Sequence, residues 1–541
     1  MITELAGAEP NRLDSKLKQG LSARDSQLRR NWIAIVGIAA VALGVLAFQA
    51  FLHGHYSAVD EYDDGVYFGA SVELIHGVIP YRDFAFIQPP MITAWLLPFA
   101  ALSTLTGTAV AMEVARILVD LVTVTNVVLV GVLVRRRTTT QVIVATGVMA
   151  LSQGTIRSSQ TILLEPFLVL ACLVAFNFLM SVEHITASNH RLWWCGTFLG
   201  VASATKVWAV LPLAATLIVL APRGARELRT LVGGAIFGFG VCTLPFIIGA
   251  PRAFFQQVVV TQAIRNGAGF PLPQRLADLT GIPGLSSLTA THEVVGSALL
   301  SLVLCVGFGA LLVGWRVRRD APWSPLERLG LWGAAFVAIG LLAAPTYYYH
   351  YSGFMAPFVA LVASSLVVRV KDPLCRIVPL RSLFLPNLLA LFAVPVAVAL
   401  LLGATIIEVA GLPVAPGVGD AVADAIPGHG CILYANPTLA LLDDRFTSDV
   451  SGCPHVIDWL GQERVIDNGG AAVPSDDGDK KLQIVMGRWI ESSDAVVLEK
   501  SDLGLDSANV DYLDRHFNRE ADVPRGLRIF VRDSRARHIR S

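Results

Sequence analysis

Long apolar runs separated by short polar segments fill the first three quarters of the chain. Runs of roughly twenty apolar residues occur at 32–52, 108–134, 160–181, 229–250, 293–314, 327–345, 350–369 and 383–408, which is long enough for a helix to cross a bilayer. Shorter or interrupted runs at 139–153, 192–206 and 207–221 complete the set. The pattern therefore predicts about eleven transmembrane helices.

Basic residues fall on one side of these predicted helices. They cluster at Arg29–Arg30, Arg135–Arg137, Arg223–Arg229, Arg316–Arg319 and Arg369–Arg381. Lys and Arg collect on the cytoplasmic side of short loops. The alternation therefore predicts a cytoplasmic N-terminal tail over 1–31, a transmembrane domain over 32–408 and an extracytoplasmic remainder.

Two long outer loops follow from this topology. The apolar run 91–102 breaks the alternation if it spans, and it is short and follows Pro89 and Pro90. We interpret it as an interfacial helix, so the first outer loop covers 53–107. The second outer loop, 251–292, contains several prolines and is expected to be a mobile flap.

The segment 409–541 has a different character, with Asp, Gly and Pro throughout. Its short apolar stretches, at Cys431–Tyr434, Leu482–Met486, Ala495–Leu498 and Leu527–Val531, have the length of strands. These features predict a small extracytoplasmic α/β domain. Because oxidising compartments favour disulfides, we expect Cys431 and Cys453 to pair there.

Composition supports a membrane protein and excludes several activities. Of the 541 residues, 54% are hydrophobic and only 16% are charged, against roughly 25% charged in soluble proteins. The formal net charge is zero, so nothing suggests nucleic acid as a partner. Glycine-rich phosphate loops, HExxH and CxxC motifs are absent from the sequence, which leaves soluble nucleotide-sugar, ATP-driven and zinc chemistry without support.

The densest group of polar residues lies in the first outer loop. Asp60, Glu61, Asp63 and Asp64 directly follow a predicted transmembrane helix, where carboxylates facing lipid would be costly. They must therefore face water, a partner or a metal. A solvated acidic loop is the simpler interpretation, but the interleaved aromatic and small residues of EYDDGVYFGA favour an ordered helix.

Several motifs resemble one family. The string DDGVYFGASVELIHGVIPYRDFAFIQPP (63–90) resembles the first outer loop of membrane glycosyltransferases of the C-type (GT-C) fold, nearest the branch of protein O-mannosyltransferases and lipid A aminoarabinose transferases. Glu165-Pro166 is similar to the family's second acidic motif, usually Asp-Pro, and Thr205-Lys206 to its Thr-Lys motif. The turn Tyr347–Tyr351 is similar to its late outer turn. Val66 and Gln88 stand where the aminoarabinose branch has Arg and Lys, so those phosphate contacts do not transfer.

The resemblance implies a fold and a reaction. The fold is a polytopic α-helical membrane protein of the GT-C type with interfacial helices and the α/β domain. Transfer from a prenyl phosphate needs a base for the acceptor hydroxyl and cations for the leaving phosphate. Asp63 is the expected base of one inverting displacement, and Asp64 is expected to position the base or the acceptor. Glu165 has either role or holds a cation, unless it is only a carboxylate favoured at a helix start.

Lys206 is the first candidate for the donor phosphate. It is flanked by apolar residues at the predicted outer edge of the bilayer, so it needs either an anion or a snorkelling route. Further candidate substrate contacts are Tyr67, Arg82, Arg157, Arg265 and His350. For Arg157 and Arg265 the alternative is a solvated loop arginine, for His350 an aromatic interfacial belt, and for Arg82 a local pair with Asp83.

The expected protein is thus a glycosyltransferase at the outer face of the bacterial cytoplasmic membrane. It would transfer sugar from a polyprenyl-phosphate donor to an extracytoplasmic glycan, lipid or protein hydroxyl. Richness in Ala, Val, Arg and Gly is typical of high-GC bacteria; in an actinobacterium, decaprenyl-phosphate mannose or arabinose would be natural donors, with mannose preferred. A lipid or glycan transporter and a lipid-diphosphate oligosaccharide ligase remain alternatives. No cofactor is indicated with certainty, and Asp60 and Glu61 leave a divalent cation open.

Overall fold

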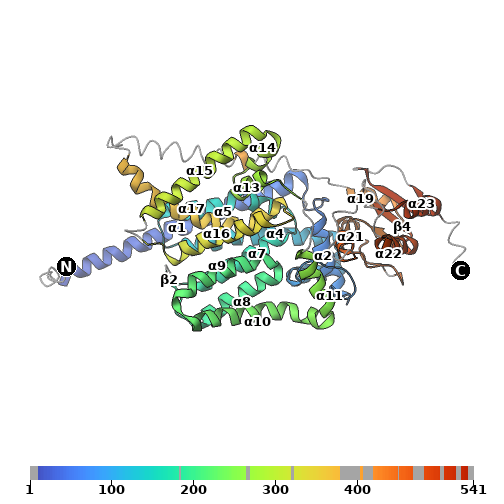
Figure 1. The fold of residues 1–541 in the computed structure, drawn as a ribbon, viewed down its shortest axis with the longest axis horizontal. Helices are drawn as coiled ribbons and strands as arrows, with labels where there is room; N and C mark the ends of the chain where they lie inside the picture. The colour runs from blue at the N-terminus through green and yellow to red at the C-terminus, as the bar shows by residue number, and fades with distance from the viewer. Residues whose placement is uncertain are drawn as a thin grey trace.

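The computed structural model describes residues 10–181, 184–263, 269–317, 322–377, 403–405, 418–448, 450–466, 480–499, 505–519 and 526–533. These form a long helical bundle with a smaller α/β unit at one end (Figure 1). Helix α1 projects from the opposite end of the bundle. Apart from 403–405, the predicted helix over 383–408 lies outside the described residues.

The bundle helices coincide with the predicted apolar runs. They are α1 (Pro10–His53), α4 (Thr108–Val134), α5 (Thr139–Leu151), α7 (Leu164–Leu179), α8 (Asn189–Thr205), α9 (Val210–Leu220), α10 (Ala225–Gly249), α15 (Glu293–Val317), α16 (Pro325–Ala343) and α17 (Ala356–Ile377). Within the described residues, α1, α4, α10, α15 and α16 contain stretches long and apolar enough to cross a membrane. The chain is therefore a multi-pass membrane protein.

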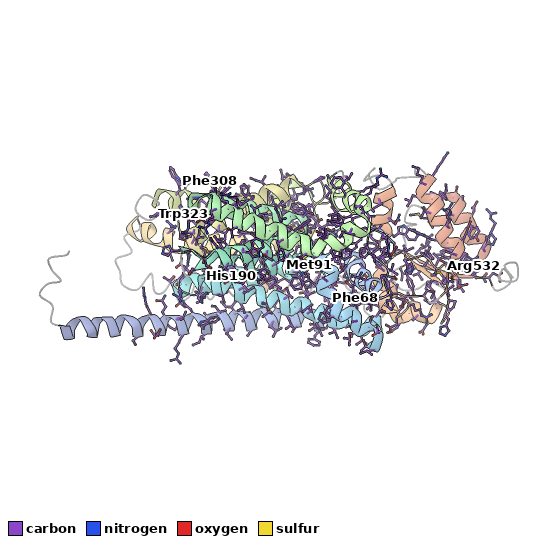
Figure 2. The ribbon with its side chains drawn as sticks, turned by 90° about the horizontal axis from the view of Figure 1, so that it is seen from below. Phe68, Met91, His190, Phe308, Trp323 and Arg532 are labelled. Carbon is purple, nitrogen blue, oxygen red and sulfur yellow. A yellow bond between two sulfur atoms is a disulfide. The ribbon has the colours of Figure 1, made fainter. Side chains whose placement is uncertain are left out.

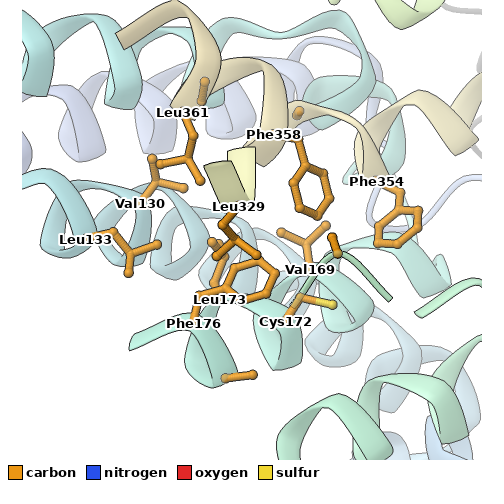
Figure 3. Packing of buried hydrophobic residues seen from close by; sticks show 14 of the residues in the cluster. Val130, Leu133, Val169, Cys172, Leu173, Phe176, Leu329, Phe354, Phe358 and Leu361 are labelled. Carbon is orange, nitrogen blue, oxygen red and sulfur yellow. The ribbon is translucent and has the colours of Figure 1, made fainter. Parts of the chain in front are cut away.

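Apolar side chains of four helices make the centre of the bundle. Val130 of α4, Phe176 of α7, Leu329 of α16 and Phe358 of α17 are buried and belong to one cluster (Figure 3). Helices α8 and α10 approach still more closely. A Cβ at Gly196 of α8 would lie 2.0 Å from a backbone oxygen of α10, which illustrates how small residues let membrane helices pack.

Short elements connect these helices. The hairpin β1 (Met180–Ser181) and β2 (His184–Ile185) follows α7, and η1 (Val207–Ala209) and η2 (Ala221–Arg223) flank α9. At one end of the bundle, Glu327 of α16 bonds to Arg369 at 2.8 Å and lies 3.5 Å from Arg137. Two of the predicted cytoplasmic basic clusters therefore meet at the same end.

The two predicted outer loops contain helices. The first holds α2 (Tyr62–Ile75) and α3 (Met91–Thr106), the helix expected to be interfacial. The second holds α11 (Pro251–Phe255), the π-helical η3 (Gln256–Val260), α12 (Thr261–Ala263), α13 (Leu272–Leu279) and α14 (Leu285–Thr291). Helix α6 (Gln153–Ser158) and the 3₁₀ turn η4 (Tyr349–Phe354) lie side by side, because Gly154 leaves room for the backbone of Gly353.

The C-terminal unit is the predicted α/β domain. Its sheet has the order β3-β4-β6-β5, with β3 (Ile432–Tyr434) parallel to β4 (Ala495–Leu498). Strand β6 (Arg528–Arg532) is antiparallel to β4 and to β5 (Phe517–Arg519). Its helices are α19 (Val418–Ala425), α20 (Pro437–Leu442), α21 (Trp459–Ile466), α22 (Lys480–Ser492) and α23 (Ser507–His516). The expected Cys431–Cys453 disulfide is present.

One predicted strand was wrong. Leu482–Met486 belongs to helix α22, not to the sheet. Leu482, Met486 and Ile490 are all buried and are spaced four residues apart, which places them on one helix face.

The α/β unit packs directly on α2, in the first of the two predicted outer loops. Helix α20 lies against α2, where Gly65 and Gly69 leave room for Thr438 and Phe446. Together with packing on α3 and α4, this contact buries α2 from Asp64 to Glu73. In Figure 2, Phe68 of α2 lies between the bundle and the sheet that carries Arg532.

Candidate active site

A polar cavity of about 160 Å³ lies where α2, η4 and the C-terminal unit meet. Its polar lining residues are Glu61, Tyr62, Asp63, Tyr67, Gln88, Lys206, Tyr348, Tyr349, His350, Tyr351 and Asp458. Four of the residues selected from the sequence are among them: Asp63, Tyr67, Lys206 and His350.

Asp63 lies in the first turn of α2 and is partly exposed to the cavity. One turn further, the hydroxyl of Tyr67 donates to Asp63 Oδ2 at 3.2 Å. Burial, together with the charge of Asp63, raises the pKa of Tyr67 well above its usual range. Tyr67 therefore keeps its proton and holds the Asp63 carboxylate in place.

Asp64, the next residue, is fully buried and does not line the cavity. Arg116 of α4 donates to its Oδ2 at 2.5 Å, and the hydroxyls of Thr161 and Thr438 also donate to the carboxylate. Arg116 in turn binds the carbonyl oxygens of residues 55, 56 and 58. Asp64 thus ties α2 to the bundle and to the C-terminal unit.

Glu165 and Lys206 form a buried ion pair beside the cavity. The distance from Lys206 Nζ to Glu165 Oε1 is 2.5 Å, and Nζ also lies 3.8 Å from the ring centroid of Tyr351. Lys206 has an extended backbone conformation between α8 and η1, so it belongs to neither helix. Glu165 itself does not line the cavity.

His350 completes this group from η4. Its Nδ1 lies 3.8 Å from Glu165 Oε2. Burial lowers the pKa of His350, although Glu165 opposes this effect, so the ring is neutral. Among the described residues, neither ring nitrogen has a hydrogen-bond partner. Such buried polar groups are rare in native proteins, and the residue that carries them here belongs to the cavity lining.

A larger apolar groove of about 440 Å³ adjoins the polar cavity. The two share Gln88, Lys206 and Tyr351 in their linings, and the rest of the groove is mostly apolar, with Trp208 and Val258 among its residues. Lys206 therefore lies where the apolar groove meets the polar cavity.

Two further carboxylates line the cavity: Glu61, considered from the sequence only for a cation, and Asp458, which the sequence analysis did not consider. The hydroxyl of Tyr349 donates to Glu61, and burial raises the pKa of Glu61 to about 8, with the charge of Asp63 adding to the effect. Asp458 comes from the C-terminal unit and accepts a hydrogen bond from Tyr62 at 3.1 Å. No motif marks Asp458, and it lies 396 residues from Tyr62 in the chain.

Two of the remaining predicted contacts, Arg82 and Arg157, are not in the cavity lining. Arg82 is exposed and pairs with Asp83 at 2.7 Å, as the simpler interpretation held. Arg157 lies 5.6 Å from the ring centroid of Tyr349 and donates to Ser287, so it backs the cavity wall. Arg265 lies outside the described residues.

The two carboxylates considered for a cation are engaged with protein groups. Asp60 Oδ2 lies 2.9 Å from His55 Nδ1, and Glu61 accepts from Tyr349. In the part of the chain that the structure describes, no three His, Cys, Asp or Glu side chains gather in a metal-binding group.

Comparisons with known proteins bear on the fold. A family model of dolichyl-phosphate-mannose-protein mannosyltransferases matches residues 98–235. ArnT from Cupriavidus metallidurans bound to undecaprenyl phosphate has a TM-score of 0.58 and 15% identity, covering 93% of this chain and 98% of that chain. The same protein in its apo state has a TM-score of 0.56 and 16% identity, covering 92% of this chain and 97% of that chain. No curated protein matches the sequence.

These matches confirm the GT-C fold and the resemblance to this group of membrane glycosyltransferases. The segment matched by the family model contains Arg116, Glu165 and Lys206.

Proposed function

We propose that this chain transfers a sugar from a polyprenyl-phosphate donor to a hydroxyl of an extracytoplasmic glycan, lipid or protein. The observation that carries the proposal is the position of Lys206, between an apolar groove and a cavity that contains Asp63. A polyprenyl-phosphate sugar has a long apolar chain, an anionic phosphate and a polar sugar in the same order. The structurally similar ArnT was solved with undecaprenyl phosphate.

In this proposal the prenyl chain lies in the groove along Trp208 and Val258, and the phosphate binds Lys206. Lys206 shares its charge between Glu165 and the phosphate, which keeps the ammonium compensated when the site is empty. Neutral His350 donates a further hydrogen bond to the phosphate. Charge-assisted hydrogen bonds of this kind are roughly twice as strong as neutral ones.

The chemical step is a single displacement. The acceptor hydroxyl oxygen forms a bond to the anomeric carbon while its proton passes to Asp63. The bond from the anomeric carbon to the phosphate oxygen breaks, and the prenyl phosphate leaves with the electron pair, stabilised by Lys206. Attack opposite to the leaving group inverts the anomeric configuration.

Asp64 and Glu165, both candidates for direct catalysis from the sequence, take positioning roles in this account. Asp64 fixes α2 through Arg116 and Thr438, and so fixes the neighbouring Asp63. Glu165 holds Lys206 at the junction of groove and cavity. Neither lines the cavity.

We propose mannose as the sugar, with arabinose as the alternative donor, because the matching family model describes enzymes that use a dolichyl-phosphate-linked mannose. The enzyme would lie in the bacterial cytoplasmic membrane with its N-terminus inside. The cavity and the C-terminal unit would then face outwards.

The experiment is transfer of radiolabel from synthetic prenyl-phosphate-mannose and prenyl-phosphate-arabinose to membrane glycan acceptors by the purified enzyme, with and without EDTA. We expect transfer from the mannose donor that EDTA leaves unchanged. Transfer from arabinose alone would change the sugar, and loss of transfer in EDTA would require a cation. Failure with both donors would contradict the proposal and favour the transporter or the diphosphate ligase.

A further inference from the structure

The cavity has two sides of different origin. On one side, Gln88, Lys206 and Tyr351 also line the apolar groove, where the proposed donor enters. The second part of the lining, Asp458 and Leu460, comes from the C-terminal unit and does not line the groove. A donor that fills the groove and reaches Lys206 therefore leaves the side formed by the C-terminal unit to the second substrate.

The position of Asp458 is fixed by contacts with α2 and with the first turn of α21, the helix that follows it. The hydroxyl of Tyr62 donates to Asp458 Oδ1 at 3.1 Å and accepts from the backbone N–H of Leu460 at 3.1 Å. The backbone N–H of Gly461 donates to the same carboxylate at 2.7 Å. Because Tyr62 directly precedes Asp63, the helix that carries the proposed base also sets the distance to Asp458.

The segment that leads to Asp458 is fastened at two further points. Cys453 is joined to Cys431, at the start of the sheet, by the disulfide. His455 Nδ1 lies 3.2 Å from Glu73 Oε2 near the other end of α2. Asp458 is therefore held against α2 rather than carried on an unattached loop.

The chemistry of this side suits a neutral polyol. A carboxylate accepts hydrogen bonds from sugar hydroxyls, and Tyr62, Tyr349 and Leu460 supply hydroxyl and apolar surface around it. Among the described residues that line the cavity, Lys206 is the only lysine or arginine, and it is paired with Glu165. An anionic acceptor would be repelled by the carboxylates of Asp63 and Asp458, and no further lysine or arginine among the described lining residues would compensate its charge.

We propose that Asp458 binds the acceptor, and that the acceptor is a neutral glycoside whose non-reacting hydroxyls donate to this carboxylate. The C-terminal unit then forms half of the substrate site and selects the acceptor by charge. The inference rests on the proposed glycosyl transfer and extends it to the acceptor class.

The test uses the full-length enzyme, synthetic prenyl-phosphate-mannose and two acceptors that differ only in charge, octyl β-D-glucopyranoside and octyl β-D-glucuronide. Hydrolysis of the donor without acceptor, compared with Asp63→Asn, reports the proposed function on its own. Transfer is then measured for the unchanged enzyme, Asp458→Asn, Tyr62→Phe and the control Asp511→Asn, an exposed change in α23 of the same unit.

We expect the unchanged enzyme to prefer the neutral glucoside by at least about tenfold in kcat/KM, since like charges brought together oppose binding. Asp458→Asn should raise the KM for the glucoside by about tenfold, as for loss of a hydrogen bond to a charged group. It should also reduce the ratio of kcat/KM for the glucoside to that for the glucuronide. The KM for the donor should stay unchanged. Tyr62→Phe should act in the same direction with a smaller factor, and Asp511→Asn should change neither KM.

Four results would overturn the inference while leaving the proposed function standing. The first is donor hydrolysis that depends on Asp63 but is not accompanied by transfer to the glucoside, and the second is equal use of both acceptors. The third is an unchanged KM for the glucoside in both Asp458→Asn and Tyr62→Phe. The fourth is an equal rise in the KM for the donor and the KM for the glucoside. Absence of donor hydrolysis and of transfer alike would instead refute the proposed function.

Discussion

The carboxylates of Asp63 and Asp64, neighbours in the chain, lie in different surroundings. Asp63 lines the cavity beside Tyr67. Asp64 is fully buried and bonded to Arg116 at 2.5 Å. Adjacent residues of a helix do not face the same side. The first turn of α2 therefore presents the Asp63 carboxylate to the cavity, while the next carboxylate, Asp64, fixes the helix to the bundle.

Asp64→Asn is expected to lower stability far more than Asp63→Asn. Removing one partner of a buried ion pair typically costs about 3–5 kcal/mol, because Arg116 keeps its charge without compensation. The free energy of unfolding in detergent micelles, or the Tm where unfolding is irreversible, measures the difference. Equal stability of the two variants would contradict the structural role of Asp64, and Asp63→Asn serves as the matched control.

Variants of Lys206 and Glu165 are expected to affect protein stability and donor binding differently. Lys206→Met or Glu165→Gln alone leaves a buried charge unpaired and lowers stability, whereas the double variant should recover much of that loss. Donor kcat/KM should stay low in the double variant, by roughly tenfold or more, because a hydrogen bond to a charged group is worth about 1.5–3 kcal/mol. Thermal unfolding and donor titrations measure the two effects, and recovered donor use in the double variant would refute phosphate binding by Lys206.

The pH profile is expected to fall on the alkaline side. Burial raises the pKa of Glu61 to about 8, so Glu61 is protonated at neutral pH and ionises beside Asp63 as pH rises. The added charge should disfavour the departing phosphate and reduce kcat/KM above about pH 8. The pKa of Glu61 is higher in the folded protein than in the unfolded chain. Its contribution to the free energy of unfolding therefore decreases as pH rises from about 4.5, the unfolded pKa, to about 8, the folded pKa.

Glu61→Gln removes this titration, so the fall in kcat/KM above about pH 8 should disappear. The fall in the unfolding free energy between about pH 4.5 and 8 should become smaller by the part that Glu61 contributes. Transfer rates and thermal unfolding between pH 5 and about 9.5 measure both quantities. An unchanged alkaline limb in the variant would assign the titration to another group.

The sequence predicted the bundle well because apolar runs of membrane length leave little choice of structure. The run 108–134 coincides with α4. Arg137, just after this helix, and Arg369 both pair with the carboxylate of Glu327. The motif resemblance likewise selected Asp63, Lys206 and His350, which the fold brings to one cavity.

Other parts of the site depend on contacts that no local pattern encodes. Asp458 reaches the cavity through docking of a unit almost 400 residues away in sequence, and the burial of Asp64 depends on Arg116 and Thr438 from two other elements. In α22, short apolar stretches resembled strands, since helix and strand are difficult to distinguish over five residues.

The most direct test of the account compares the intact enzyme with Asp63→Asn at equal folded amount, measuring transfer of radiolabelled mannose from synthetic prenyl-phosphate-mannose. A well-placed general base contributes about 10²- to 10⁴-fold, so the account predicts a loss of that size with an unchanged KM for the donor. Undiminished transfer by Asp63→Asn would contradict it.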